Sequence, residues 1–499
     1  MIVRDDRILR AGDYDQEVYR CEYLVVGTGA GGSVAGKCLA EAGRNVLFLE
    51  EGPYTPTGKY TRSVSEMVSR LYRNEGASPF VGRPTIAFGE GRCVGGGTTI
   101  NGGVIWRTPP HILEEWSRIH GLPGYGLEQL APHFAQIERL LHVKTEELDD
   151  GNGDSVAMME GARSLGWRTV MEPRAVIECK NTNLCPTGCP TGAKQGAMET
   201  YIPMGLEAGA LLFSDCRALK IQHQGTRASS VLVEVQDDAR LRFRIEFEHL
   251  VLAGGAVQTP HLLRRSGISK EAGRRLEFHM PLKVVALFDR DIDAARGTIS
   301  TVQIQEFERD GLLMMTSNLS PHFLAIALSF QGDDAVNHVL DRMHRAGIYM
   351  ALVRSRSVGR IFGCFLDQPM VRYRFLKEDL HSAKIALQRM SKVLFASGAV
   401  ELYMPFKSRA VRSMSDAEQV IGSLKPEHLE ILTVHAMSSC PMGISSASSV
   451  VDPSGSLWGF KNVLITDASV LPSNTGTSPQ GTIMAFAHEI VSRHLNGFS

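Results

Sequence analysis

A glycine-rich stretch near the start of the chain, VVGTGAGGS at residues 25–33, constrains the fold more than any other feature. It closes a short apolar run at 23–27 and precedes a segment with helical spacing of apolar residues at 33–46. A second apolar run, VLFLEEG, follows at 46–52. An apolar run, a glycine turn, a helix and another apolar run together predict a βαβ unit.

The glycines of this turn have the G-x-G-x-x-G spacing of a dinucleotide-binding loop. Gly27 permits the tight turn, Gly29 allows the backbone to approach a pyrophosphate, and Gly32 allows close packing of helix on strand. Glu50 ends the second apolar run, where a carboxylate can accept hydrogen bonds from a ribose. The motif predicts dinucleotide binding, the alternative being a glycine turn in an α/β domain without such a ligand. It does not separate NAD from FAD.

Length and composition narrow the class of protein. A chain of 499 residues with 43% hydrophobic residues is too long for one ordinary core, so we expect two packed domains. The net charge of -1 gives no indication of a nucleic-acid partner. The charged N-terminus lacks an apolar segment, no long apolar run predicts a transmembrane helix, and the nine cysteines are scattered. We expect a cytoplasmic protein.

Three later segments complete the pattern. Seven glycines at 89–103 predict a loop whose backbone passes close to a flat or a crowded group. Residues 249–268 predict a strand, a glycine pair and a helix that begins near Thr259. Residues 462–495 predict a strand ending at Asp467 and a final helix, so the end of the chain returns to the first domain.

Four blocks in this order carry a resemblance to a known family: the N-terminal loop ending in LFLEEG, GRCVGGGTTINGG, LVLAGGAVQTPHLLRRSGI, and HAMSSCPMG followed by NVLITDASVLPSNTGTSPQGTIMAFA. The chain resembles the glucose–methanol–choline (GMC) oxidoreductases, which are FAD enzymes. The segment at 114–141 is also similar to the family, and the second block looks most like the branch of bacterial cholesterol oxidases and long-chain-alcohol oxidases. The resemblance therefore implies FAD as the cofactor.

The same resemblance implies an α/β fold with two domains. A Rossmann-like, three-layer FAD-binding domain would span residues 1–282, with 425–499 returning to it. An α+β substrate-binding domain, built on an antiparallel sheet, would span 283–424. The alternating apolar stretches at 282–288, 311–319, 323–330, 346–355 and 369–376 predict its strands, and 380–399 predicts an amphipathic helix on its outer side.

By resemblance, the first loop holds the FAD pyrophosphate and Glu50 binds the adenosine ribose. The second block would lie along the isoalloxazine ring, and the last block would pass close to the cofactor. The helix that starts at about Pro479 would direct its positive end at the N1–C2=O edge of the flavin, where negative charge builds on reduction. Besides the first loop, the cofactor residues expected are Gly95, Gly96, Asn101, Asp467, Ala468 and Pro479.

The implied reaction removes a hydride from the CH–OH group of an alcohol, with flavin N5 as the acceptor. His435, in TVHAMSSCPMG, falls where the family has its active-site histidine, and a neutral imidazole suits a base. Ser478 occupies the position of the usual second Asn or His. A serine there can assist through a hydrogen bond or a water, with Thr477 and Asn474 as alternative donors in the same loop.

This serine also motivates an alternative function: a flavoenzyme of the same fold with lyase, decarboxylase or biosynthetic ring-forming chemistry. Methionine and aromatic residues are frequent in the middle of the chain. Most are expected to be sheet core, and some to line a pocket for a hydrophobic or bulky alcohol. The electron acceptor would be O2 or another redox partner.

One cysteine-containing stretch, at residues 179–203, is unusual. Cys179, Cys185 and Cys189 stand at spacings that match no standard metal or iron–sulfur motif. The resemblance extends to this stretch, because a similar one occurs in some bacterial members of the family, which need only FAD. We therefore expect a packed loop near the flavin or the substrate entrance, and no metal.

Overall fold

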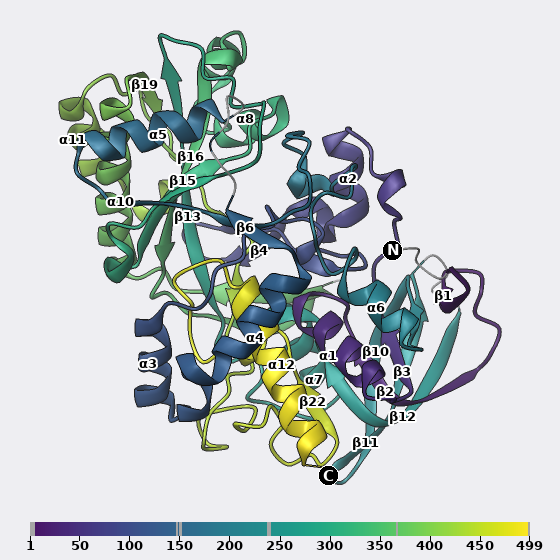
Figure 1. The fold of residues 1–499 in the computed structure, drawn as a ribbon. Helices are drawn as coiled ribbons and strands as arrows, with labels where there is room; N and C mark the ends of the chain where they lie inside the picture. The colour runs from purple at the N-terminus through teal and green to yellow at the C-terminus, as the bar shows by residue number, and fades with distance from the viewer. Residues whose placement is uncertain (1–4, 146–147, 149–151, 237–240, 366–367, 498–499) are drawn as a thin grey trace.

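The computed structural model describes residues 5–145, 148, 152–236, 241–365 and 368–497. Two large β-sheets with helices packed on them form the two ends of the molecule (Figure 1). The first and the last α-helix, α1 (Ala30–Glu41) and α12 (Gln480–Asn496), lie side by side in the lower half of that view. The expected return of the C-terminal segment is thus observed.

The first sheet has the strand order β1-β9-β3-β2-β12-β11-β10, with β22 also paired to β12. Its strands are β1 Ile8–Leu9, β2 Val18–Val26, β3 Val46–Leu49, β9 Leu211–Phe213, β10 Cys216–Gln224, β11 Arg227–Val235, β12 Arg242–Leu252 and β22 Val463–Ile465. β9, β3, β2, β12 and β22 pair in parallel. Helix α1, Ala30–Glu41, connects β2 to β3 and packs on both, so the predicted Rossmann-like βαβ unit is confirmed.

The second sheet has the order β19-β13-β16-β15-β14-β7, with β21 also paired to β13, and every pairing is antiparallel. Its strands are β7 Thr169–Met171, β13 Glu277–Phe288, β14 Val302–Ile304, β15 Leu312–Ser317, β16 Ala346–Arg354, β19 Ala399–Tyr403 and β21 Ala436–Met437. The predicted antiparallel sheet is therefore confirmed. The expected domain boundary after residue 282 falls inside β13, and β7 comes from the chain before it.

Two smaller sheets contain the remaining described strands. One has the order β17-β18-β4-β5-β20, and the other pairs β6 with β8. Their strands are β4 Ser78–Val81, β5 Ile86–Phe88, β6 Val143–Thr145, β8 Pro173–Ala175, β17 Gly359–Phe365, β18 Gln368–Tyr373 and β20 Leu432–Thr433. The stretch at 369–376 was expected in the antiparallel substrate sheet, but β18 pairs with β17 and β4 instead. Alternation predicts a strand without naming its partner.

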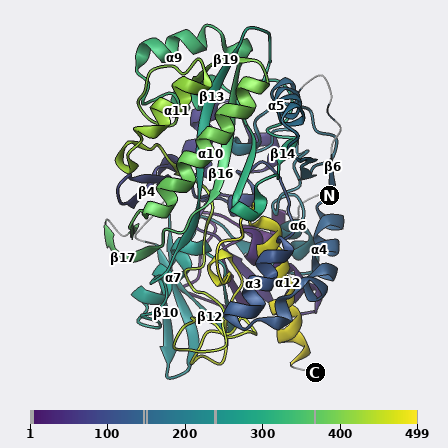
Figure 2. The same ribbon diagram turned by 90° about the vertical axis from the view of Figure 1, so that its left-hand side faces the viewer.

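The remaining helices flank the two large sheets. They are α2 Val64–Leu71, α3 Pro110–His120, α4 Leu127–Leu140, α5 Gly153–Ser164, α6 Tyr201–Glu207, α7 Gly255–Arg265, α8 Pro321–Ala327, α9 Asp333–Leu340, α10 Lys377–Ala396, α11 Met414–Gly422 and α12 Gln480–Asn496. Helices α6 and α12 lie against α1, and α10 crosses the second sheet together with α5 and α11 (Figure 2). No described helix combines the length and apolarity needed to span a bilayer.

Two helical predictions need correction. The apolar stretch at 323–330 was expected to be a strand, but it lies largely in α8. Ser320 caps that helix by accepting a hydrogen bond from the Phe323 N–H at 3.3 Å, and Pro321 occupies its first turn. A short apolar run alone does not distinguish strand from helix, whereas the Ser-Pro pair does.

Helix α7 begins at Gly255, earlier than the predicted start near Thr259. Pro260 therefore lies inside the helix, where it has no N–H to donate to the carbonyl of Ala256. The Ser439 hydroxyl donates to that carbonyl instead, at 2.5 Å. This replacement contact comes from a segment far along the chain, so the local sequence did not reveal it.

Candidate active site

Helix α1 presents its N-terminus at the edge where the parallel strands end. Gly27 has a φ of +100, and a Cβ there would lie 2.3 Å from the carbonyl oxygen of Ala253. A Cβ on Gly32 would lie 2.0 Å from the Gly27 oxygen, which fits the predicted close packing. Gly29, the residue before the helix, has no atom within 4 Å of such a Cβ. The N–H groups of α1 are thus approachable from outside at Gly29.

Glu50 joins this loop to the second glycine-rich loop. Its buried carboxylate accepts hydrogen bonds from the Thr28 N–H and hydroxyl, at 3.0 and 2.7 Å, and from the Gly52 N–H at 3.0 Å. The Thr28 hydroxyl in turn accepts from the Gly95 N–H at 3.0 Å. Burial raises the pKa of Glu50, although these bonds act in the opposite direction. Its expected contact with a ribose stays a prediction.

Gly95 and Gly96 bring the second loop against the first. A Cβ on Gly96 would lie 3.0 Å from the Cα of Gly29, and Gly96 begins a short 3-10 turn, Gly96–Thr98. The amide of Asn101 donates to the side-chain oxygen of Gln480 in the first turn of α12. The expected loop therefore lies between the N-termini of α1 and α12.

Asp467 follows β22 and ties three segments together. Its carboxylate accepts hydrogen bonds from the Gly255 N–H at the start of α7 and the Ser469 N–H, both at 2.8 Å, and from the hydroxyls of Thr259 and Ser469. The next residue, Ala468, accepts from the Ser438 N–H at 3.0 Å through its carbonyl. The turn that begins at Asp467 is thus joined to α7 through its carboxylate and to the segment after His435 through Ala468.

The buried Lys194 is a site residue that the sequence did not single out. Its ammonium donates to three carbonyls: Thr99 at 2.6 Å, Asn101 at 2.9 Å and Cys185 at 2.7 Å. Burial lowers the pKa of this lysine. Lys194 therefore fastens the cysteine-containing stretch to the loop at Asn101, as expected of a packed segment near the cofactor. Cys185 and Cys189 are buried there, and Cys179 is half-buried.

His435 pairs with a second histidine, His279, which also escaped the sequence analysis. The register of β21 on β13 aligns Phe278 with Ala436, so the next cross-strand pair is His279 and His435. Their Nδ1 atoms lie 3.0 Å apart, and the His279 N–H donates to the His435 carbonyl at 3.3 Å. His279 is fully buried behind His435, which is half-buried.

Both imidazoles are held neutral. Burial lowers the pKa of His435 to about 4. Burial, together with the nearby His435 and Arg354, holds the pKa of His279 well below its usual value. Two adjacent neutral rings can share a single N–H···N hydrogen bond, whereas two cations would repel each other.

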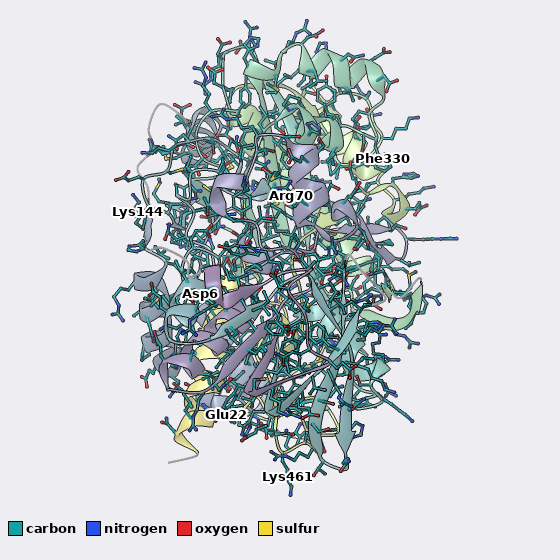
Figure 3. The ribbon with its side chains drawn as sticks, turned by 90° about the vertical axis from the view of Figure 1, so that its right-hand side faces the viewer. Asp6, Glu22, Arg70, Lys144, Phe330 and Lys461 are labelled. Atoms are coloured by element: carbon teal, nitrogen blue, oxygen red, sulfur yellow. The ribbon has the colours of Figure 1, made fainter. Side chains whose placement is uncertain are left out.

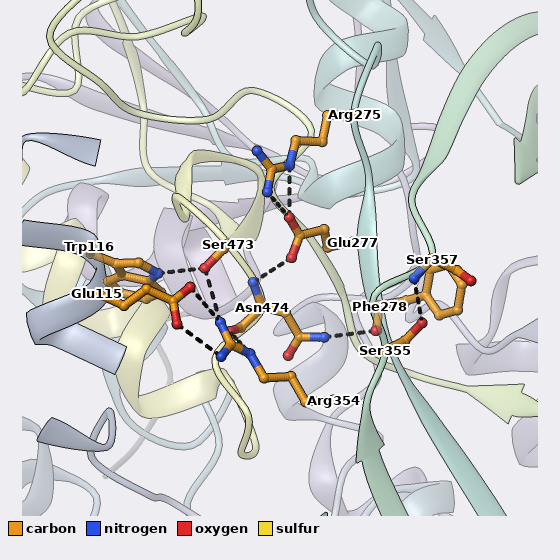
Figure 4. Close-up of polar contacts among 10 residues, drawn as sticks. All are labelled: Glu115, Trp116, Arg275, Glu277, Phe278, Arg354, Ser355, Ser357, Ser473 and Asn474. Carbon is orange, nitrogen blue, oxygen red and sulfur yellow. Dashed lines mark hydrogen bonds and ion pairs between the residues drawn. The ribbon is translucent and has the colours of Figure 1, made fainter. Parts of the chain in front are cut away.

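A polar network fixes the loop beside this pair (Figure 4). Asn474 donates from its N–H to Glu277 and from its amide to the Phe278 carbonyl, both at 2.8 Å. Arg354 donates to the Asn474 carbonyl at 3.1 Å and forms a bidentate ion pair with Glu115, at 3.0 and 2.9 Å. Asn474, an expected alternative donor, is thus held next to His279.

Ser478 lies half-buried at the end of this loop, directly before Pro479, which precedes α12. Among the described residues no hydrogen bond joins Ser478 to His435, whose ring partner is His279. The carbonyl of Thr477 accepts a hydrogen bond from the Thr475 hydroxyl at 2.6 Å. The assisting role of Ser478 stays a prediction.

The second sheet is apolar on both faces. One face packs under α5 and α10 and includes Met314; the other carries a small separate cluster of Leu313, Met315 and Leu352, with Met350 against it. Two aromatic residues in the middle of the chain, Phe330 and Phe362, are 50% and 44% exposed, so they are not part of the sheet core that was expected for most of these residues. Phe330 lies at the molecular surface (Figure 3). An apolar pocket lined by other residues of this region stays a prediction.

Comparison with known proteins identifies the family. The N-terminal family model of the GMC oxidoreductases matches residues 22–281, and the C-terminal model matches 366–487. The chain belongs to the GMC oxidoreductase family. This GMC oxidoreductase is accordingly an FAD flavoprotein, and the open approach at Gly29 and the paired helix N-termini fit a dinucleotide.

Known relatives cover most of this GMC oxidoreductase. A GMC-type oxidoreductase of Mycobacterium tuberculosis is 32% identical over 94% of the chain and 75% of its own length. A long-chain-alcohol oxidase of Arabidopsis thaliana is 27% identical over 94% of the chain and 68% of its own length. The structure of pyridoxine 4-oxidase from Mesorbium loti superposes with a TM-score of 0.72 at 16% identity, covering 95% of this chain and 99% of that one.

Proposed function

We propose that this GMC oxidoreductase oxidises the CH–OH group of an alcohol, with His435 as the base that takes the hydroxyl proton. Bound FAD would supply the acceptor for the hydride. The protein residues would hold the alcohol against His435 and keep that imidazole neutral. One observation carries the proposal: the imidazole of His435 is half-buried and neutral, and its Nδ1 contacts the Nδ1 of the buried His279.

The protonation state of His435 suits this role. A general base must be unprotonated at the working pH, and burial lowers the pKa of His435 to about 4. Its Nδ1 is engaged by His279, and its Nε2 makes no hydrogen bond within the described residues. Nε2 is therefore the nitrogen that can receive a proton from a substrate.

The proposed substrate is a bulky or hydrophobic alcohol. The face of the second sheet opposite α5 and α10 carries the cluster of Leu313, Met315 and Leu352. His279 lies on the neighbouring strand β13, which pairs with β16 through His279 and Arg354. The similarity to plant long-chain-alcohol oxidases supports the same substrate class.

Anaerobic reduction of the flavin tests the proposal. The purified protein should be yellow, and mixing it without oxygen with a panel of primary alcohols of increasing chain length should bleach the flavin absorbance. We expect the longer apolar alcohols to bleach it at lower concentration than ethanol does. If no alcohol of a broad panel reduces the flavin, the proposal is wrong.

A second candidate function is flavin-dependent lyase, decarboxylase or ring-forming chemistry. The lack of a hydrogen bond between Ser478 and His435 within the described residues favours it. The substitution Ser478→Asn discriminates between the two. Faster alcohol turnover by the variant would indicate that serine serves other chemistry, whereas slower turnover would indicate that serine is fitted to the alcohol.

A further inference from the structure

The contact between His279 and His435 restricts where their protons lie. Both rings present Nδ1 to the contact, 3.0 Å apart, with the ring planes at 78°. A hydrogen bond at this distance needs one N–H and one lone pair. Because both rings are neutral, each carries a single proton, so one Nδ1 is protonated and the other is not.

Two arrangements satisfy this condition. In the first, His435 donates from Nδ1, which leaves its Nε2 with a lone pair, and His279 carries its proton on Nε2. In the second, His279 donates from Nδ1, and His435 carries its proton on Nε2. Only the first arrangement leaves His435 with a basic nitrogen directed away from His279.

The surroundings of His279 favour the first arrangement. Its buried Nε2 makes no hydrogen bond within the described residues, so this atom alone does not decide between the two arrangements. The Asn474 side chain lies beside the ring and favours a proton on it. The amide nitrogen of Asn474 donates one N–H to the Phe278 carbonyl, and its oxygen accepts from the Gly476 N–H at 3.0 Å, which leaves that oxygen a second lone pair for a proton on His279.

We propose that His279 is a positioning residue that accepts a hydrogen bond from Nδ1 of His435 and thereby keeps Nε2 of His435 free to take the substrate proton. This inference rests on the proposed function of His435 as the base. After proton transfer, His435 is a cation that still donates from Nδ1, and a hydrogen bond to a cation is stronger than one between neutral groups. His279 therefore stabilises the product of the proton transfer more than it stabilises the resting state.

Two substitutions separate this role from simple packing. Asparagine can place its side-chain oxygen close to the position of Nδ1 and accept the same hydrogen bond, whereas leucine cannot. We expect His279→Leu to slow anaerobic flavin reduction by about 10- to 100-fold with little change in the alcohol concentration for half-maximal rate. His279→Asn should recover most of this loss. The exposed His381 provides the control, since His381→Leu should reduce the flavin at the wild-type rate.

A spectroscopic measurement reads the proton positions directly on the wild-type protein, without His279→Leu. With ¹⁵N-labelled histidine at pH 7, His435, assigned by loss of its signals in His435→Asn, should show a protonated Nδ1 and an unprotonated Nε2. A protonated Nε2 on His435 would overturn the proposal, as would a wild-type rate for His279→Leu. If His435→Asn also reduced the flavin at the wild-type rate, the proposed function itself would be wrong, so the two failures are distinguishable.

Discussion

The two sides of the site treat their buried polar groups differently. On the cofactor side, both oxygens of Glu50 and both oxygens of Asp467 accept hydrogen bonds from the protein, and Lys194 donates to three carbonyls. On the catalytic side, the Nε2 of His279 and the hydroxyl of Ser438 are buried without a hydrogen-bond partner among the described residues. The protein therefore partners these charged groups of the cofactor side fully, whereas a ring nitrogen and a hydroxyl beside the proposed base have no partner within the described residues.

This difference follows from what each side must do. A buried charge costs several kcal/mol unless it is hydrogen-bonded, so carboxylates and an ammonium that hold loops together must be fully partnered. A base must keep one atom free for its substrate, and burial keeps the imidazole neutral because it disfavours the charged form. Substitutions on the two sides should consequently have different effects. On the catalytic side they should slow the reaction, and on the cofactor side they should lower the stability or the FAD content.

The largest effect is expected on the catalytic side. His435→Asn removes the proposed base while keeping a polar side chain of similar size, so anaerobic flavin reduction by alcohol should slow by about 10²- to 10⁴-fold. The flavin absorbance of the oxidised variant, and hence its FAD content, should match that of the wild type. Loss of FAD from this variant would contradict the proposal that the catalytic side serves the reaction and the cofactor side holds FAD.

Lys194→Met tests the cofactor side. Removing the ammonium leaves the carbonyls of Thr99, Asn101 and Cys185 buried without their donor. We expect the free energy of unfolding to fall by about 3 kcal/mol, measured by urea denaturation, and FAD to dissociate more readily. The exposed Lys461 provides the control (Figure 3), because Lys461→Met should change neither property. An unchanged FAD content in a stable Lys194→Met protein would argue against the fastening role.

A smaller effect is expected at Gly29. Its φ of -66 suits any residue, and an added methyl group would meet no protein atom within 4 Å. Gly29→Ala should therefore fold normally but weaken FAD binding by about 10-fold, because the methyl group would occupy the approach to the α1 N-terminus. Gly58→Ala, an exposed position that is equally open, is the control.

Gly31, two residues further along the chain, sharpens this prediction. A Cβ on Gly31 would lie 1.9 Å from the carbonyl oxygen of Thr466, so Gly31→Ala should reduce the yield of folded protein. If Gly29→Ala bound FAD as tightly as the wild type, the proposed place of the pyrophosphate would be wrong.

The sequence predicted best what is local. The βαβ unit, the second glycine-rich loop and the final helix follow from short spans of apolar residues and glycines, and each is present. The helix at 321–327 was missed because an apolar run of that length is ambiguous, although Ser320 and Pro321 marked its start. The cofactor assignment came from the family resemblance, since the loop alone left NAD and FAD open.

Contacts between distant segments were not predictable in the same way. His279 is one of 16 histidines, and nothing in its neighbourhood marks it until the register of β21 on β13 aligns it with His435, 156 positions further along the chain. Lys194 was likewise indistinguishable from a surface lysine, although it followed the stretch that carries the cysteines. Register between remote strands, rather than local pattern, decides both contacts.

The pH dependence of anaerobic flavin reduction tests the central claim most directly. Because burial lowers the pKa of His435 to about 4, the base is unprotonated above that value and becomes protonated as the pH falls through it. With a saturating alcohol that does not itself ionise, the reduction rate should stay level from pH 8 to about pH 5 and fall to half near pH 4. A rate that already falls to half near pH 6.5, the ordinary histidine value, would contradict a buried, neutral His435 as the base.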